Sequence, residues 1–128
     1  MKIFVEDVAD AVHGRVRFRC GGRSVEGIWA GEGEPPVEVE VNVELEPPDE
    51  GLISSRLLPG PPLEPMGQEG EFVILRGRVE GVSPDGILEF RVASDVVLLE
   101  QHGQLADARP GMNLELRMPN IKIYPRDL

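Results

Sequence analysis

Side chains that commonly carry out catalysis are few in this sequence, and their positions do not form a known catalytic pattern. The histidines are His13 and His102, each followed by a glycine, and Cys20 is the lone cysteine. Because Cys20 alternates with Val16 and Phe18, we expect it to point into the core, where a thiol behaves as a small hydrophobic side chain. None of the five serines lies in a G-x-S-x-G turn. These observations argue against nucleophilic catalysis.

The residues that could bind a metal or a nucleotide do not have the spacing that such sites require. Zinc sites use three or four nitrogen or sulfur ligands, and here the histidines and the cysteine are far apart in the sequence. The sequence contains no G-x-x-x-x-G-K-[ST] loop. Carboxylate pairs, such as Asp7 with Asp10 or Asp49 with Glu50, have no fixed sequence signature. We therefore predict a non-catalytic protein with no cofactor and no metal, and keep an enzyme that uses a carboxylate pair as an alternative.

The clearest periodic pattern runs over residues 37–45, where apolar and polar side chains alternate without exception. A period of two is typical of a strand with one face on a core and the other in water. The polar face would carry three candidate partner-binding carboxylates: Glu38, Glu40 and Glu44. Neighbours on one face of a strand lie about 7 Å apart, which is too far to surround one cation. The alternative is pairing across the sheet with three arginines of an earlier strand: Arg15, Arg17 and Arg19.

Residues 46–70 interrupt the strand pattern, because they contain half of the 12 prolines. Proline removes a backbone donor and is excluded from central strands and helix interiors. We therefore predict a Pro/Gly-rich crossover flap. Its apolar side chains should pack back onto the core, since burying each is worth about 1.5–3 kcal/mol, or meet a partner if they are exposed. These candidate residues are Leu52, Ile53, Leu57 and Leu58, and Trp29 is a further candidate that could instead belong to the core.

Short strands separated by Gly/Pro turns predict an all-β fold, a small antiparallel barrel or sandwich of about 7–9 strands. The length of 128 residues suits a single domain. We divide it into a first strand set at 1–45, the flap at 46–70 and a second strand set at 71–128. The second set is expected to end in a strand pair, 112–118 with 121–124.

The second strand set resembles the five-stranded oligonucleotide/oligosaccharide-binding (OB) barrel in the order of its elements. A long first strand at 72–82 contains Gly77 and Gly81, a turn at 83–86 leads to two shorter strands, and the last strand pair follows Gly111. The resemblance predicts that 72–82 bends at a glycine so that it serves two sheets. It departs from the barrel pattern at residues 101–111, which have room for one helical turn at most.

The formal net charge is −10, and the excess of arginine over lysine indicates a GC-rich bacterial genome. No apolar run is long enough for a signal peptide or a membrane span, so we expect a cytoplasmic protein without membrane association. A negative surface repels phosphate backbones, and the phenylalanines of the expected strands fall on apolar faces, so we expect no nucleic-acid binding.

The first functional hypothesis is therefore an acidic protein-interaction module, such as an inhibitor or immunity-type protein for a basic protein partner. The alternative from a different class is an OB-like module that binds a ligand or an oligonucleotide.

Overall fold

The computed structural model describes residues 1–48, 54–101 and 103–126. Within these ranges the protein is all-β, as predicted, but it has eleven strands, more than the predicted number of about 7–9, and one short 3-10 turn, η1 (Gly103–Leu105). The strands are β1 (Lys2–Asp10), β2 (Arg15–Arg19), β3 (Ser24–Trp29), β4 (Val39–Glu46), β5 (Ser54–Leu57), β6 (Met66–Glu69), β7 (Phe72–Val82), β8 (Ile87–Val92), β9 (Asp95–Glu100), β10 (Asn113–Met118) and β11 (Lys122–Pro125).

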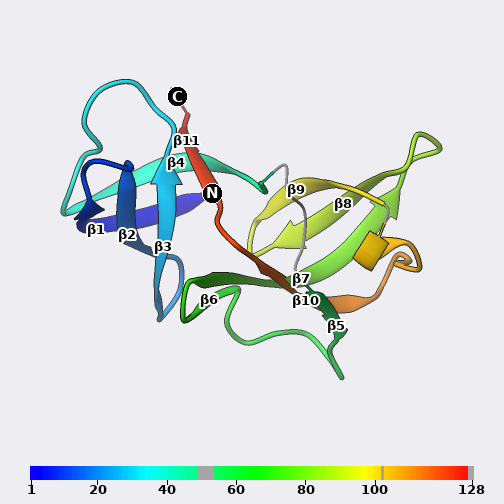
Figure 1. The fold of residues 1–128 in the computed structure, drawn as a ribbon. Coiled ribbons are helices and arrows are strands. Elements are labelled where there is room, and N and C mark those ends of the chain that lie inside the picture. The colour runs from blue at the N-terminus through cyan, green and yellow to red at the C-terminus, as the bar shows by residue number, and fades with distance from the viewer. Residues whose placement is uncertain (49–53, 102, 127–128) are drawn as a thin grey trace.

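Five strands close into a barrel in the order β1-β2-β3-β11-β4 (Figure 1). β1, β2 and β3 form an antiparallel meander, and β4 returns to pair with β1. β11 lies between β3 and β4, parallel to the former and antiparallel to the latter. The barrel therefore combines the first four strands of the chain with the last one.

The other strands form an open sheet beside the barrel, in the order β5-β10-β7-β8-β9, with β6 paired to the first part of β7 (Figure 1). The predicted pairing of 112–118 with 121–124 was wrong, because β10 pairs with β5 and β7 whereas β11 pairs with β3 and β4. Ile121 and Ile123 are fully buried. Pro119 separates the two strands and cannot donate to a ladder, so the chain leaves the open sheet there.

β7 is continuous within the open sheet, which contradicts the expectation that it serves two sheets. One of its edges pairs with β6 over residues 72–75 and with β8 over residues 78–82. Gly77 lies between these two pairings, and a β-bulge falls between Val79 and Gly81. The second strand set therefore does not close on itself, and its resemblance to the OB barrel is not confirmed.

The Pro/Gly-rich segment contributes two short strands, β5 and β6, to the open sheet. Four of its prolines lie between these strands, where no ladder hydrogen bond is needed: Pro59, Pro61, Pro62 and Pro65. Leu57 is exposed and Leu58 is half-buried, so the expectation that these leucines pack onto the core is wrong for Leu57. Leu52 and Ile53 lie outside the described residues.

Buried apolar side chains of both sheets form one connected cluster. Its fully buried large members include Phe18 and Ile123 from the barrel and Leu75 and Phe90 from the open sheet. Cys20 belongs to this cluster with 8% of its surface exposed, which confirms that it points inward. Burial raises the pKa of its thiol, which disfavours the reactive thiolate.

The arginines of β2 pair with acids of the neighbouring strands β1 and β3. The ion pairs are Arg15 with Glu26, Arg17 with Asp7, and Arg19 with Glu6, at N–O distances of 4.0, 2.9 and 3.4 Å. The predicted pairing with the carboxylates of residues 38–44 was wrong, because β4 lies between β1 and β11 and does not neighbour β2.

Candidate partner-binding cleft

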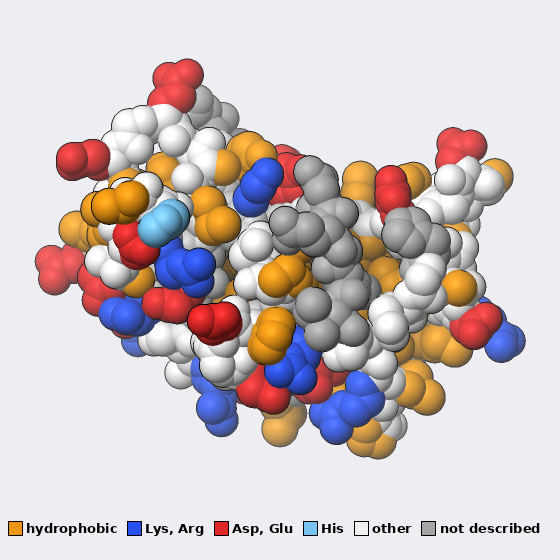
Figure 2. Space-filling view, viewed as in Figure 1, with side chains coloured by type: hydrophobic (Ala, Val, Ile, Leu, Met, Phe, Trp, Pro, Cys, Tyr) orange, Lys and Arg blue, Asp and Glu red, His pale blue; other side chains and the backbone are white. Residues whose placement is uncertain are grey.

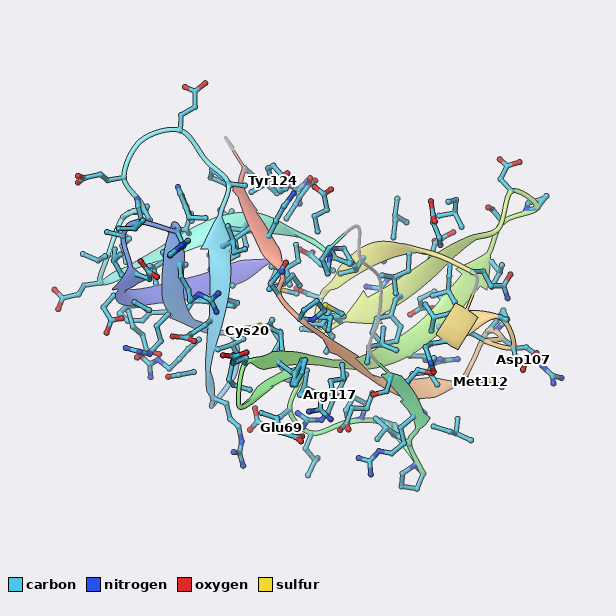
Figure 3. All side chains as sticks on the ribbon, in the orientation of Figure 1. Cys20, Glu69, Asp107, Met112, Arg117 and Tyr124 are labelled. Atoms are coloured by element: carbon cyan, nitrogen blue, oxygen red, sulfur yellow. The ribbon has the colours of Figure 1, made fainter. Side chains whose placement is uncertain are left out.

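A cleft of about 410 Å³ opens between the barrel strands β4 and β11 and the edge strand β9. This volume lies within the range of about 300–1,000 Å³ that is common for ligand pockets. The lining residues come from two short runs, 44–47 and 95–98, together with Met1, Tyr124 and Arg126. Tyr124 marks the β11 side of the cleft in Figure 3. The cleft therefore lies at the junction of the two sheets.

The backbone edge of β9 faces this cleft. The four consecutive residues Asp95, Val96, Val97 and Leu98 all line it, although successive side chains of a strand point to opposite faces of a sheet. Val97 is buried, whereas Val96 is 39% and Leu98 is 62% exposed. The edge of β9 thus presents two apolar side chains to solvent on the face away from the core.

The hydrogen-bond register shows which backbone groups of β9 point outward. The Gln101 N–H donates to the carbonyl of Gly86 at 2.8 Å, and hydrogen-bonded pairs alternate in an antiparallel ladder. Val97 and Leu99 therefore exchange hydrogen bonds with Phe90 and Leu88 on β8. Val96 and Leu98, which alternate with them, direct their N–H and C=O groups away from β8. No described residue forms a hydrogen bond with these outward groups.

Carboxylates outnumber cations around the cleft. Asp95 forms an ion pair with the Met1 amine, and Glu44 Oε1 lies 3.5 Å from Arg126 Nε. Glu46 is exposed, and among the described residues it has no ion-pair partner. On the open sheet, the exposed Glu89 lies directly across from Leu98. Lys122 lies directly across from Glu46 on β11, but the two form no ion pair, so a cationic group entering the cleft would still meet one exposed carboxylate without a bound cation.

Of the predicted carboxylates, only Glu44 lines the cleft. Glu40 is exposed on β4 across from Phe4 of β1. Glu38 precedes β4 with a positive φ of 57°, and its N–H donates to the carbonyl of Val5 at 2.7 Å. The alternating pattern of residues 37–45 therefore becomes a regular strand from Val39 onward, and the three carboxylates do not form one site.

The described apolar residues that were predicted to contact a partner also lie away from the cleft. Leu57 is 65% exposed at the end of β5, on the opposite edge of the open sheet. The N–H of Leu58 donates to the carbonyl of Asn113 at 2.8 Å, so this residue extends the β5–β10 ladder. Trp29 ends β3 and packs partly against the core, which was the alternative to partner binding for this residue. Its indole nitrogen is buried and has no hydrogen-bond partner among the described residues.

Most arginines of the open sheet form ion pairs with acids, namely Arg56, Arg76, Arg91 and Arg117, whereas the exposed Arg78 has no ion-pair partner among the described residues. Arg117 Nη2 lies 3.6 Å from Glu69 Oε1, and its guanidinium stacks 4.2 Å from the centroid of the Phe72 ring. Figure 3 shows Arg117 and Glu69 on the same part of the sheet. Arg78 alone is therefore left without an opposing acid on this face, too little to form a stripe along a phosphate backbone.

The candidate catalytic groups do not converge. His13 Nδ1 lies 2.7 Å from Asp10 Oδ2 in the exposed turn between β1 and β2. This hydrogen bond lowers the pKa of Asp10, while Cys20 is buried at the far end of β2. His102, Asp49 and Glu50 lie outside the described residues. Within the described ranges, no three His, Cys, Asp or Glu side chains are grouped to hold a metal ion, and no helix could span a membrane.

The chain matches no protein-family model, no curated protein and no solved structure.

Sequence reasoning missed most of the cleft. The run Val96-Val97-Leu98-Leu99 carries a usable signal, because four apolar residues in a row exceed what a strand with one solvated face requires. The sequence does not reveal that β9 is an edge strand, nor that β4 and β11 end beside it. Asp95, Glu46 and Tyr124 could be assigned to one site only after the strand order was known.

Proposed function

We propose that this protein is a non-catalytic interaction module that binds a basic segment of another protein in the cleft between β4, β9 and β11. An inhibitor or immunity protein for a cationic enzyme is one role of this kind. The observation that carries the proposal is an exposed apolar strand edge beside a cleft in which carboxylates outnumber cations.

Charge supports a basic partner. The net charge of −10 attracts cationic proteins over long distances and speeds their encounter. Within the cleft, Glu46 offers an exposed carboxylate at short range. The exposed apolar side chains of Val96 and Leu98 support a specific complex, because a partner that covers them removes their apolar surface from water. The negative charge therefore speeds association with a basic partner, and the apolar side chains of β9 slow its dissociation.

A charge-reversal variant tests this proposal with a defined probe, a short synthetic peptide in which lysine and valine alternate. Replacing Glu46 by lysine changes a carboxylate in the cleft, and we expect the affinity measured by titration calorimetry to fall about tenfold. The interaction should also weaken as ionic strength rises above about 0.15 M.

The matched control is Glu32→Lys, which makes the same change in net charge at an exposed position in the loop between β3 and β4. We expect this variant to change the affinity less than about twofold. An equal loss for both variants would show that the peptide responds only to net charge, and would contradict binding in the cleft.

A second candidate is ligand or oligonucleotide binding by the barrel. It is supported by the strand order β1-β2-β3-β11-β4 with β11 parallel to β3, an arrangement that OB barrels also use. The β2 arginines count against phosphate binding, because each is paired with an acid. Micromolar binding of a single-stranded oligonucleotide at about 0.15 M salt, with no binding of the lysine–valine peptide, would favour this candidate over the first.

A further inference from the structure

The geometry of β9 points to strand addition as the mode of binding. We propose that an extended lysine-containing segment of a partner protein pairs with the edge of β9 at Val96 and Leu98 and becomes the next strand of the open sheet. This inference rests on the proposed function and specifies how the basic segment is held.

The backbone groups required for strand addition are present at the edge. Val96 and Leu98 direct their N–H and C=O groups away from β8, and no described residue forms hydrogen bonds with them. An extended peptide that adds to an exposed edge gains main-chain hydrogen bonds there, while its alternate side chains provide specificity. The edge of β9 therefore offers two donors and two acceptors in the spacing of a strand.

The side chains around β9 define which segment fits. Every second residue of an added strand would lie beside Val96 and Leu98, which favours apolar β-branched residues such as valine. The exposed carboxylate of Glu46 lines the cleft beside this edge, whereas Glu89 lies across from Leu98 and shares the sheet face of Val96 and Leu98. Lysine or arginine at the intervening positions of the added strand can approach Glu46. The complementary segment therefore alternates apolar and basic residues.

A second copy of this chain fits the edge poorly. Two copies would bring together two molecules that each carry a charge of −10, and the carboxylates near β9 would face one another. The other edge of the open sheet is also less suitable for a basic segment. β5 is only four residues long, and the cationic Arg56 lies on its outer face, paired with Glu115 at 3.1 Å.

Proline substitution tests the backbone contribution directly. Leu98→Pro removes an outward N–H that the β8–β9 ladder does not use, so the fold should survive, since proline is tolerated on edge strands. For the lysine–valine peptide we expect this variant to lower the affinity about tenfold, from one lost hydrogen bond and the altered edge. Leu98→Ala keeps the N–H and should lower the affinity by a smaller factor.

The matched control is Leu57→Pro on the opposite edge of the sheet. Leu57 is 65% exposed, close to the 62% of Leu98. The N–H of Leu58 donates to Asn113, so the N–H of Leu57 points away from β10 in the same way. We expect Leu57→Pro to change the affinity less than about twofold. Equal losses for the two proline variants would overturn strand addition at β9.

Amide hydrogen exchange in the unmodified protein provides a second measurement that does not depend on the folding of a variant. Binding of the peptide should slow exchange at the amides of Val96 and Leu98 about tenfold or more, and should leave Leu57 unchanged. Binding that is sensitive to Glu46→Lys but leaves the two β9 amides unprotected would overturn strand addition while the proposed function stands. Protection of the β9 amides by self-association, without peptide, would assign the edge to a second copy and overturn the proposal.

Discussion

At the scale of single residues, Glu115 is the most constrained carboxylate of the open sheet. Its Oε2 lies 2.8 Å from Arg76 Nε, and its Oε1 lies 3.1 Å from Arg56 Nη2. Burial alone would raise the pKa of Glu115, but the hydrogen bond from Arg76 and the charges of both arginines outweigh it and lower the pKa. The ionised form of Glu115 therefore stabilises the folded protein.

This network predicts a pH-dependent effect of Glu115→Gln on stability. Because the folded pKa lies below the unfolded one, the contribution is present above about pH 4.3 and is lost as the pH falls through the folded pKa. We expect the variant to lower the free energy of unfolding by about 1.5–3 kcal/mol at neutral pH and by much less near pH 2. Urea denaturation at the two pH values measures the difference.

Glu40→Gln is the control, because Glu40 is exposed and has no ion-pair partner among the described residues. It should change stability by less than about 0.5 kcal/mol at either pH. A loss for Glu115→Gln that is equal at both pH values would contradict the role of its charge.

The sequence predicts whether a side chain points into the core where this depends only on alternation along the strand. The burial of Cys20 follows from its alternation with Val16 and Phe18. The partners of Arg15, Arg17 and Arg19 could not be predicted, because an ion pair across a sheet depends on which strands are neighbours. Local alternation does not contain that information.

At the scale of elements, Gly77 packs closely against β8 at the point where the edge of β7 changes its partner from β6 to β8. A Cβ atom at this position would lie 2.0 Å from the carbonyl oxygen of Arg91 on β8. Gly77→Ala must therefore move the backbone of one strand, and we expect it to lower the free energy of unfolding by about 1–3 kcal/mol or more. Chemical denaturation measures this loss.

Gly81→Ala is the matched control on the same strand, because a Cβ there would meet only Glu89 Oε1, at an ordinary contact distance of 3.7 Å. We expect its effect on stability to stay within about 0.5 kcal/mol. A similar loss for both variants would show that the effect reflects glycine in a strand and not the contact with Arg91.

The elements themselves were largely predictable, whereas their assembly was not. Alternation and Gly/Pro turns located most strands, including those at 72–82 and 87–92. The short strand β6 was missed because three prolines precede it, Pro61, Pro62 and Pro65. The position of β11 between β3 and β4 was missed because neighbours in sequence were assumed to pair, and this long-range pairing has no local signal.

At the scale of the whole molecule, the insertion of the open sheet between β4 and β11 creates the candidate site. The chain leaves the barrel after β4, builds β5 to β10, and returns as β11, so the ends of β4 and β11 lie beside β9. On the face shown in Figure 2, acidic side chains are scattered among basic and apolar ones. Specificity is therefore expected from the cleft and its strand edge, and long-range attraction from the total charge.

The most direct test is to map the lysine–valine peptide onto the protein by amide chemical-shift changes in nuclear magnetic resonance spectra. We predict that the largest changes fall on residues 95–98 and 44–46, which line the cleft from two sheets. Val39, at the start of β4, and Leu57, on the opposite edge of the open sheet, should change little. Changes centred on Leu57 or on the outer face of the barrel, or no saturable change at all, would contradict binding in the cleft.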